Sequence, residues 1–139
     1  MVYRRYGSTV AVRIDRGEEI LEQLKIVCER ENVRLATVSA LGALDDFTVG
    51  VYNVDERRYY KYDFTGAYEI VSLCGNITTM NGAYYAHLHL SAAGSEGKTV
   101  GGHLNRAVVS ATCELFLHLI DGELERFCDE ETGLNLFDL

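Results

Sequence analysis

Hydrophobic residues recur at helical spacing in only one part of the chain. Between Gly17 and Asn32 the apolar positions fall three or four residues apart, and charged side chains occupy the positions between them. Acidic residues come first in this segment and basic residues later, as the helix dipole favours. The pattern predicts one amphipathic helix, whose apolar face is formed by Ile20, Leu21, Leu24, Val27 and Cys28.

The rest of the chain shows the alternation, or the short apolar runs, that are typical of β-strands. Gly42 and the turn at residues 55–57 separate two pairs of these runs, and Asn81-Gly82 is a dipeptide favoured in tight hairpins. Because short turns join neighbouring runs, we expect an α+β fold with a mainly antiparallel sheet and one principal helix. The expected strands are Thr9 to Ile14, Leu35 to Leu41, Asp46 to Asn53, Arg58 to Phe64, Tyr68 to Ile77, Tyr84 to Ala92, Ala107 to Ile120 and Leu124 to Cys128.

The segment from Ala107 to Ile120 is too uniformly apolar for a strand with one face in water. It predicts a central strand that is covered on both faces. One helix covers only one face of a sheet, so the other face needs a partner. Burial alone therefore favours an oligomer.

A chain of 139 residues, 47% hydrophobic and 24% charged, has ordinary globular composition. We expect one compact domain over residues 1–139. The sequence shows no signal peptide and no stretch long enough to span a bilayer, which favours a cytoplasmic protein without a membrane partner. Four cysteines lie far apart without a Cys-x-x-Cys pair, and we expect buried free thiols at Cys28, Cys74, Cys113 and Cys128.

The formal net charge is -8, from 13 basic and 21 acidic residues. Such a charge repels phosphate backbones, so direct binding of duplex DNA is disfavoured. An alternative is that basic residues gather on one face of an oligomer and bind nucleic acid there. Scattered, solvated charges are the favoured interpretation of these residues, which are Arg4, Arg5, Arg57 and Arg58.

Three histidines within seventeen residues are the best candidate site. His87 and His89 are two residues apart on an expected strand, so both project from one face. His103 follows a polar, glycine-rich segment that is expected to be a loop, and Gly101-Gly102 would let the backbone approach a neighbour. Three neutral imidazoles would hold a divalent ion, most simply zinc, with one position open. Because imidazole must be neutral to coordinate, we expect affinity to fall below about pH 6.5.

The alternative interpretation is that His87 and His89 are surface residues and that His103 is an unrelated loop residue, since a His-x-His pair alone is weak evidence. His118 lies in an apolar run and is expected to be packed or hydrogen-bonded rather than a ligand. Gly97-Lys98-Thr99 lacks the earlier glycine and the following helix of a phosphate-binding loop. No motif supports a covalent nucleophile.

Several segments together resemble the PPC (plants and prokaryotes conserved) family, in its stand-alone prokaryotic form. They are Ala67 to Ile77, His87-Leu88-His89-Leu90-Ser91, Gly101-Gly102-His103-Leu104 and the following apolar strand. The resemblance implies a homotrimer and a metal carried by His87, His89 and His103. Prokaryotic relatives are often labelled as candidate DNA-binding proteins, and plant relatives add AT-hook segments, while the domain itself mediates assembly and protein contacts. This chain contains no Arg-Gly-Arg AT-hook.

Two functions from different classes compete. The first is a trimeric binding or assembly module with a three-histidine metal site and possible protein partners. The second is a metal-dependent enzyme that acts on a small molecule through an open zinc position, with Glu96 or Glu114 transferring a proton. Ser91 or Glu114 would orient a ligand ring. The enzyme requires a pocket at the histidines with a carboxylate within reach.

Overall fold

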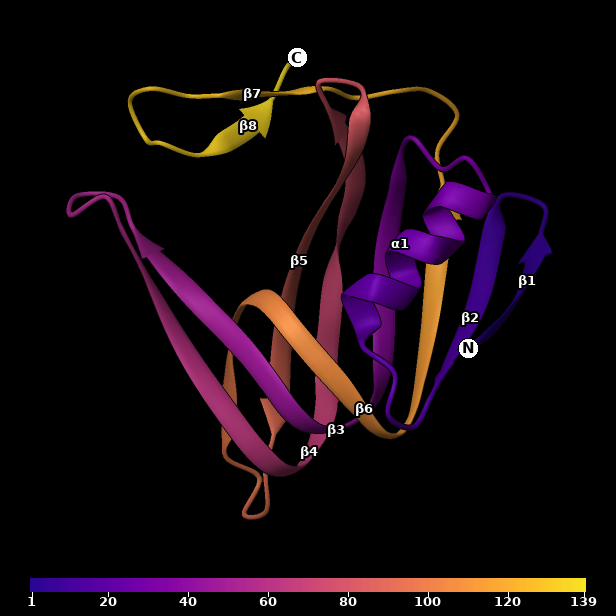
Figure 1. Cartoon of the computed structure of the whole chain (residues 1–139), viewed down its shortest axis with the longest axis vertical. Coiled ribbons are helices and arrows are strands. Elements are labelled where there is room, and N and C mark those ends of the chain that lie inside the picture. Colours follow the sequence, from indigo (N-terminus) through magenta and orange to yellow (C-terminus); the bar gives the residue numbers. More distant parts are fainter.

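The chain forms eight strands, two of which, β1 and β8, were not expected, and the amphipathic segment becomes the one helix, in a computed structural model that describes residues 1–139 (Figure 1). The mainly antiparallel sheet and the single principal helix are therefore confirmed. In chain order the elements are β1 (Val2–Tyr6), β2 (Thr9–Asp15), α1 (Ile20–Arg30), β3 (Ala36–Asn53), β4 (Arg58–Met80), β5 (Ala83–Ala93), β6 (Thr99–Leu119), β7 (Arg126–Cys128) and β8 (Asn135–Phe137).

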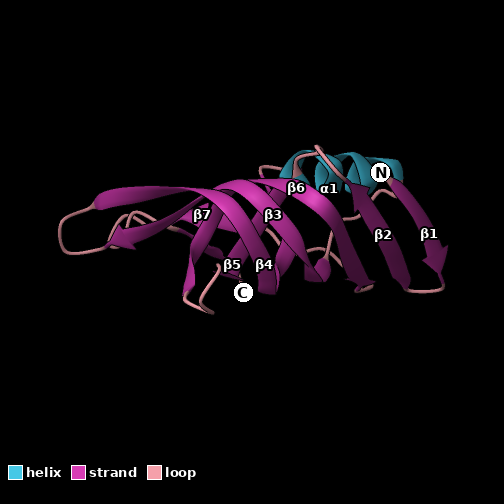
Figure 2. Cartoon of the chain, turned by 90° about the horizontal axis from the view of Figure 1, so that it is seen from below, coloured by secondary structure: helices cyan, strands magenta, loops and turns pink.

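Six strands form one antiparallel sheet in the order β1-β2-β6-β3-β4-β5. The sheet is curved (Figure 2), and β5 also pairs with the first part of β6. Strands β3, β4, β5 and β6 are thus hydrogen-bonded in a closed circuit. This closure brings together residues of β5 and β6, which would otherwise be separated by β3 and β4. Strands β7 and β8 form a separate C-terminal hairpin.

Helix α1 lies on one side of the curved sheet (Figure 2) and buries Ile20, Leu24, Val27 and Cys28. It begins later than the pattern predicts, because Gly17 and Glu18 form backbone hydrogen bonds with Val109 of β6 instead of entering the helix. The Glu19 carboxylate caps the first turn by accepting the backbone N–H of Glu22 at 2.8 Å.

Four of the expected strands merge in pairs into two long strands: the first two form β3, and the next two form β4. The merged pairs are Leu35 to Leu41 with Asp46 to Asn53, and Arg58 to Phe64 with Tyr68 to Ile77. Gly42, expected to end a strand, lies inside β3 at a shift in register with both neighbours. Its φ of +152° is accessible to glycine but rarely adopted by other residues. A Cβ at this position would also lie only 2.3 Å from the carbonyl oxygen of Thr112. The glycine therefore bends the strand as a bulge and does not interrupt it.

Strand β6 occupies a central position between β2 and β3, as expected, but it is not covered on both faces within one chain. Cys113, Leu115 and Leu117 are buried in the core, whereas the alternating residue Phe116 is 47% exposed. Leu41, on the adjacent part of β3, is 58% exposed. The expectation of a doubly covered strand is wrong for the single chain, because α1 covers one face only.

The cysteine prediction is correct for two residues of four. Cys28 and Cys113 are buried free thiols, and burial raises the pKa of each to about 12. Cys74 and Cys128 are exposed. Cys74 lies next to the buried Leu73 on β4, at a position that points away from the core. The single helix falls short of the length and hydrophobicity that crossing a bilayer requires.

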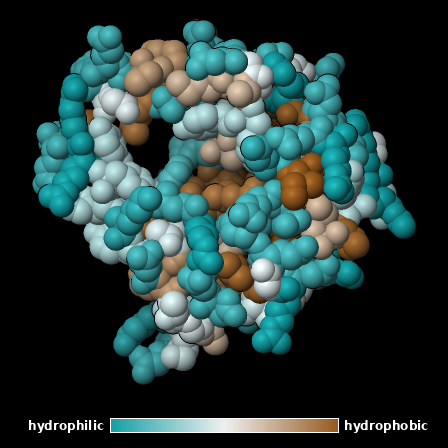
Figure 3. Space-filling model, viewed as in Figure 1, coloured by the Kyte–Doolittle hydropathy of each residue, from teal (hydrophilic) through white to brown (hydrophobic).

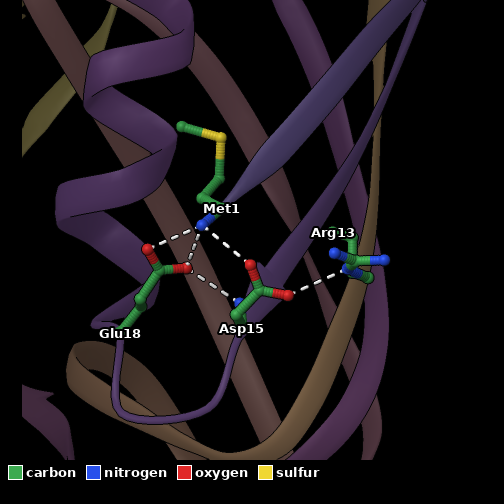
Figure 4. Close-up of polar contacts among 4 residues, drawn as sticks. All are labelled: Met1, Arg13, Asp15 and Glu18. Carbon is green, nitrogen blue, oxygen red and sulfur yellow. Dashed lines mark hydrogen bonds and ion pairs between the residues drawn. The ribbon is translucent and has the colours of Figure 1, made fainter.

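The Met1 amino group joins β2 to the start of the helix (Figure 4). It lies 2.7 Å from the Glu18 carboxylate and 3.0 Å from that of Asp15. Glu18 also accepts the Asp15 backbone N–H at 2.8 Å, and Arg13 donates to Asp15 at 2.9 Å. Hydrogen bonds from the amino group hold the pKa of both carboxyls below their ordinary values of 3.8 and 4.5.

Acid should weaken this cluster. A carboxyl whose folded pKa is lowered contributes stability above its unfolded pKa and loses it as the pH falls through the folded value. We expect Glu18→Gln to lower the free energy of unfolding at neutral pH and to flatten its decline below about pH 5, where the native carboxyl is protonated first in the unfolded chain and then, at its lowered pKa, in the folded chain. Urea unfolding at a series of pH values measures this. Glu29→Gln, which removes an exposed helix carboxylate beside Lys25, is the matched control. Parallel pH profiles for Glu18→Gln and the native protein would contradict the prediction.

Candidate metal centre

The three histidines converge where β5 meets β6. His89 and His103 are direct cross-strand partners in this pairing, and His87 lies two residues before His89 on the same face of β5. The ring centroids lie 5.1 Å apart for His87 and His89, 5.2 Å for His87 and His103, and 5.6 Å for His89 and His103. One nitrogen from each ring lies within 4.8 Å of the other two.

His103 lies on strand β6 rather than on a loop, which corrects the expectation from its glycine-rich surroundings. The glycines before it serve strand packing instead. A Cβ at Gly102 would lie 2.6 Å from the carbonyl oxygen of Gly50 on β3, so only glycine allows β6 to approach β3 this closely. This approach places His103 opposite Gly50 on one side and His89 on the other.

The surroundings of the histidines favour neutral rings. Burial, followed by the charges of His103, His89 and Arg126, lowers the pKa of His87 to about 4. Burial and the neighbouring His89 lower the pKa of His103 as well. Neutral imidazoles present the lone pairs that a metal ion needs. Proton competition at His87 should therefore begin at a lower pH than the 6.5 of an ordinary histidine.

The donor set fits a divalent ion of the first transition row. Zinc–nitrogen bonds of about 2.0–2.1 Å in a tetrahedron separate two ligand nitrogens by about 3.3 Å. The Nε2 atoms of His87 and His89 lie 3.2 Å apart. Three neutral ligands leave one tetrahedral position for a further ligand, as in catalytic rather than closed structural zinc sites. His87, His89 and His103 are the residues that would hold the ion.

A cavity of about 830 Å³ opens over the three histidines. Its floor comes from β3, β4, β5 and β6, and the C-terminal segment around β7 and β8 forms another wall. Figure 3 shows the opening between the arm formed by the tips of β3 and β4 and the C-terminal hairpin. The size is within the range of small-molecule sites in proteins. Its aromatic lining includes Tyr52, Tyr59, Tyr85 and Phe137.

One charged residue in this cavity, Arg126 of β7, was not predicted from the sequence. Its side chain reaches Asn76, the cross-strand partner of His87, through a hydrogen bond of 2.8 Å. Arg126 belongs to a short strand near the end of the chain, and no local pattern distinguishes it from a surface arginine. Only the folding of the C-terminal hairpin against the sheet reveals its position.

The carboxylates suggested from sequence lie elsewhere. Glu96 is exposed in the turn before β6, where it pairs with Lys98, and Glu114 lines a different hollow beside Phe116. Neither they nor Ser91 line the cavity over the histidines, and no other Asp or Glu does so. His118 is exposed and lies 3.3 Å from the Thr9 hydroxyl, so the expectation of a hydrogen-bonded histidine outside the site is met.

The basic residues do not gather on one face of the single chain. Arg4 and Arg5 lie on β1, whereas Arg57 and Arg58 lie at the tip of the β3–β4 hairpin. These elements are at opposite ends of the molecule in Figure 1. The side chain of Arg57 is occupied by hydrogen bonds to the carbonyl oxygens of Glu130 and Glu131.

Comparison with known proteins identifies the family to which this chain belongs. The sequence profile of the Plants and Prokaryotes Conserved (PCC) domain matches residues 1–121. The chain therefore belongs to this family, the one that its histidine and glycine segments resemble. Among curated proteins, no sequence matches the chain significantly.

Solved structures share the fold over nearly the whole chain. A protein from Bacteroides thetaiotaomicron named as a putative DNA-binding protein has 27% identity and a TM-score of 0.96, covering 99% of this chain and 96% of its own. A metal-containing protein from Archaeoglobus fulgidus has 32% identity and a TM-score of 0.89, covering 100% and 99%. A plant- and prokaryote-conserved protein from Pyrococcus horikoshii has 28% identity and a TM-score of 0.86, covering 99% and 94%.

Proposed function

We propose that this PCC-family chain is a trimeric binding module that holds one divalent ion, zinc, at His87, His89 and His103. The convergence of three ring nitrogens within 4.8 Å, at the floor of a cavity, carries the proposal. The metal-containing relative from Archaeoglobus fulgidus, at 32% identity over the full chain, supports it. A bound zinc ion would supply an open position that attracts an anionic or carbonyl oxygen.

The binding role is favoured over the enzymatic one by the composition of the cavity. Hydrolysis at a zinc site commonly uses a carboxylate to move protons, as metalloproteases do. No Asp or Glu of this chain lines the cavity, and its titratable residues besides the histidines are tyrosines and Arg126. The cavity does favour a small molecule as the ligand, so a metal-dependent enzyme is the second candidate, with a tyrosine hydroxyl in the place of the carboxylate.

Zinc loading of the purified native protein tests the metal site. The protein is stripped of metal with a chelator, dialysed against zinc and analysed for metal content, and its affinity is measured by competition with a chromophoric chelator. We expect one zinc ion per chain. A native protein that stays empty after loading would overturn the proposal.

Duplex DNA should bind negligibly near physiological salt, despite the DNA-binding names of related structures. The net charge is -8, and the arginines of β1 and of the β3–β4 tip lie at opposite ends of the molecule. Affinity for duplexes comes from cationic side chains that release counterions. Gel-shift titration at about 0.15 M salt measures it. Tight binding with a steep salt dependence would contradict this prediction and would show that the oligomer gathers basic residues from several chains.

A further inference from the structure

The most unusual charge in the molecule is the guanidinium of Arg126. Only 7% of this residue is exposed, which is rare for an arginine without a carboxylate beside it. None of the ion pairs of the chain includes Arg126. A buried cation without an anion is costly, and burial lowers the pKa of Arg126 accordingly.

Neutral groups fix the guanidinium firmly in place. It donates to the Thr78 hydroxyl at 2.8 Å, the Asn76 side-chain oxygen at 2.8 Å and the Asn135 carbonyl oxygen at 2.7 Å. The ring centroids of Tyr85 and Phe137 lie 4.8 and 4.4 Å from its central carbon. These contacts orient the group without neutralising its charge. Three of its five N–H groups are used, so two remain for a ligand.

Arg126 and the histidines belong to one cavity. Arg126 lines it, together with four of the residues that hold it, Asn76, Tyr85, Asn135 and Phe137. Asn76 pairs across the strands with His87, which places the guanidinium beside the histidine cluster. No carboxylate lines this cavity. Its walls therefore carry uncompensated positive charge, which a bound divalent ion would increase.

We propose that the cavity binds a small organic oxyanion, a carboxylate or a phosphate ester, with the charged end on Arg126 and an apolar part against the aromatic wall. One unused N–H remains on each terminal nitrogen of the guanidinium, and the two oxygens of a planar anion can accept both. A volume of about 830 Å³ suits a small molecule, and the tyrosines and Phe137 offer apolar surface to its body. The net charge of -8 disfavours a long polyanion, whose remaining phosphates would lie outside the cavity.

This inference deepens the proposed function by naming the ligand class of the same cavity. It rests on the proposed function only for the added positive charge of a metal ion, whereas the contact with Arg126 is independent of metal. Calorimetric titration therefore uses both zinc-loaded and metal-stripped protein. The probes are benzoate, phenyl phosphate and benzamide, the last being a neutral analogue of benzoate. We expect at least one of the two anions to bind and benzamide to bind at least about tenfold more weakly than benzoate where benzoate binds.

Variants locate the anion. Arg126→Met keeps the length of the side chain without its charge and should weaken anion binding about tenfold or more, because a charge-assisted pair of hydrogen bonds is lost. Arg126→Lys keeps the charge without the fork and should be intermediate. Arg58→Met is the matched control, because Arg58 also lies over an aromatic ring, at 4.9 Å from Tyr60, but outside the cavity. Circular dichroism checks that each variant is folded.

Each outcome decides one of the two proposals. Anion binding that depends on Arg126 in metal-stripped protein supports the oxyanion site even if zinc loading fails. Zinc binding without any anion binding at millimolar probe leaves the metal site standing and overturns the oxyanion site. Where benzoate binds, equal affinity for benzamide overturns the oxyanion site without any variant. Unchanged affinity in folded Arg126→Met for whichever anion binds overturns it as well. A preference for phenyl phosphate or for benzoate assigns the class of anion.

Discussion

Replacing His103 with alanine is expected to lower zinc affinity by more than about a hundredfold, which exceeds the tenfold to hundredfold loss seen when a group that only hydrogen-bonds to a ligand is removed. The physical reason is that His103 is the sole proposed ligand from β6, so its loss would leave two ligands from one strand. His87→Ala and His89→Ala should have effects of the same size. Metal content after dialysis, and chelator competition, measure the loss.

The fourth histidine provides the control for these variants. His118 is exposed on β6, where it lies beside Thr9 and outside the cavity. His118→Ala should therefore bind zinc as the native protein does. Full zinc occupancy in all three site variants would show that the ion binds elsewhere, and the histidine cluster would then be an ordinary polar patch.

A single charge on the face of the sheet away from α1 is expected to separate the proposed trimer into monomers. Phe116 and Leu41 are 47% and 58% exposed on this face, in positions that alternate with buried core residues. Covering such side chains is the physical reason to expect association, since burial of apolar surface drives it. We expect Phe116→Asp to be monomeric at micromolar concentration, because the carboxylate would be desolvated in the interface.

Light scattering measures the mass of each species against the 15.5 kDa of one chain. Val54→Asp is the matched control, because Val54 is 43% exposed but lies in the turn between β3 and β4. This control should remain trimeric. A native protein that is monomeric at micromolar concentration would contradict the prediction, and the exposed apolar face would then need another partner.

The local parts of the fold were predictable because they depend on neighbours in sequence. The apolar spacing of Ile20, Leu24 and Val27 indicates the helix regardless of what it packs against. The boundaries were less predictable, since they depend on distant contacts. A glycine at position 42 suggests the end of a strand. The backbones of β4 and β6 pair with β3 on both sides of Gly42, however, so the strand continues past it.

The site was predictable to the extent that it is local. The two-residue spacing of His87 and His89 places both on one strand face in any register. The position of His103 depends on the closure of β5 against β6, and the sequence could only indicate that glycines permit a close approach. Arg126 could not be predicted, because its burial depends on a hairpin that follows the histidines of β5 by more than thirty residues in sequence and packs back against the sheet.

The position of β2 has a consequence for how the chain folds. Apart from the short β1, its only hydrogen-bonded neighbour is β6, and the contact between Thr9 and His118 spans 109 residues. During synthesis, therefore, β1, β2 and α1 cannot complete their core until nearly all of the sheet has been synthesised. Such non-local pairing makes folding slow, on the order of milliseconds to seconds, compared with microseconds for helical bundles. Until then, β2 exposes Val10, Val12 and Ile14, so the nascent chain is most prone to aggregate just before β6 emerges from the ribosome.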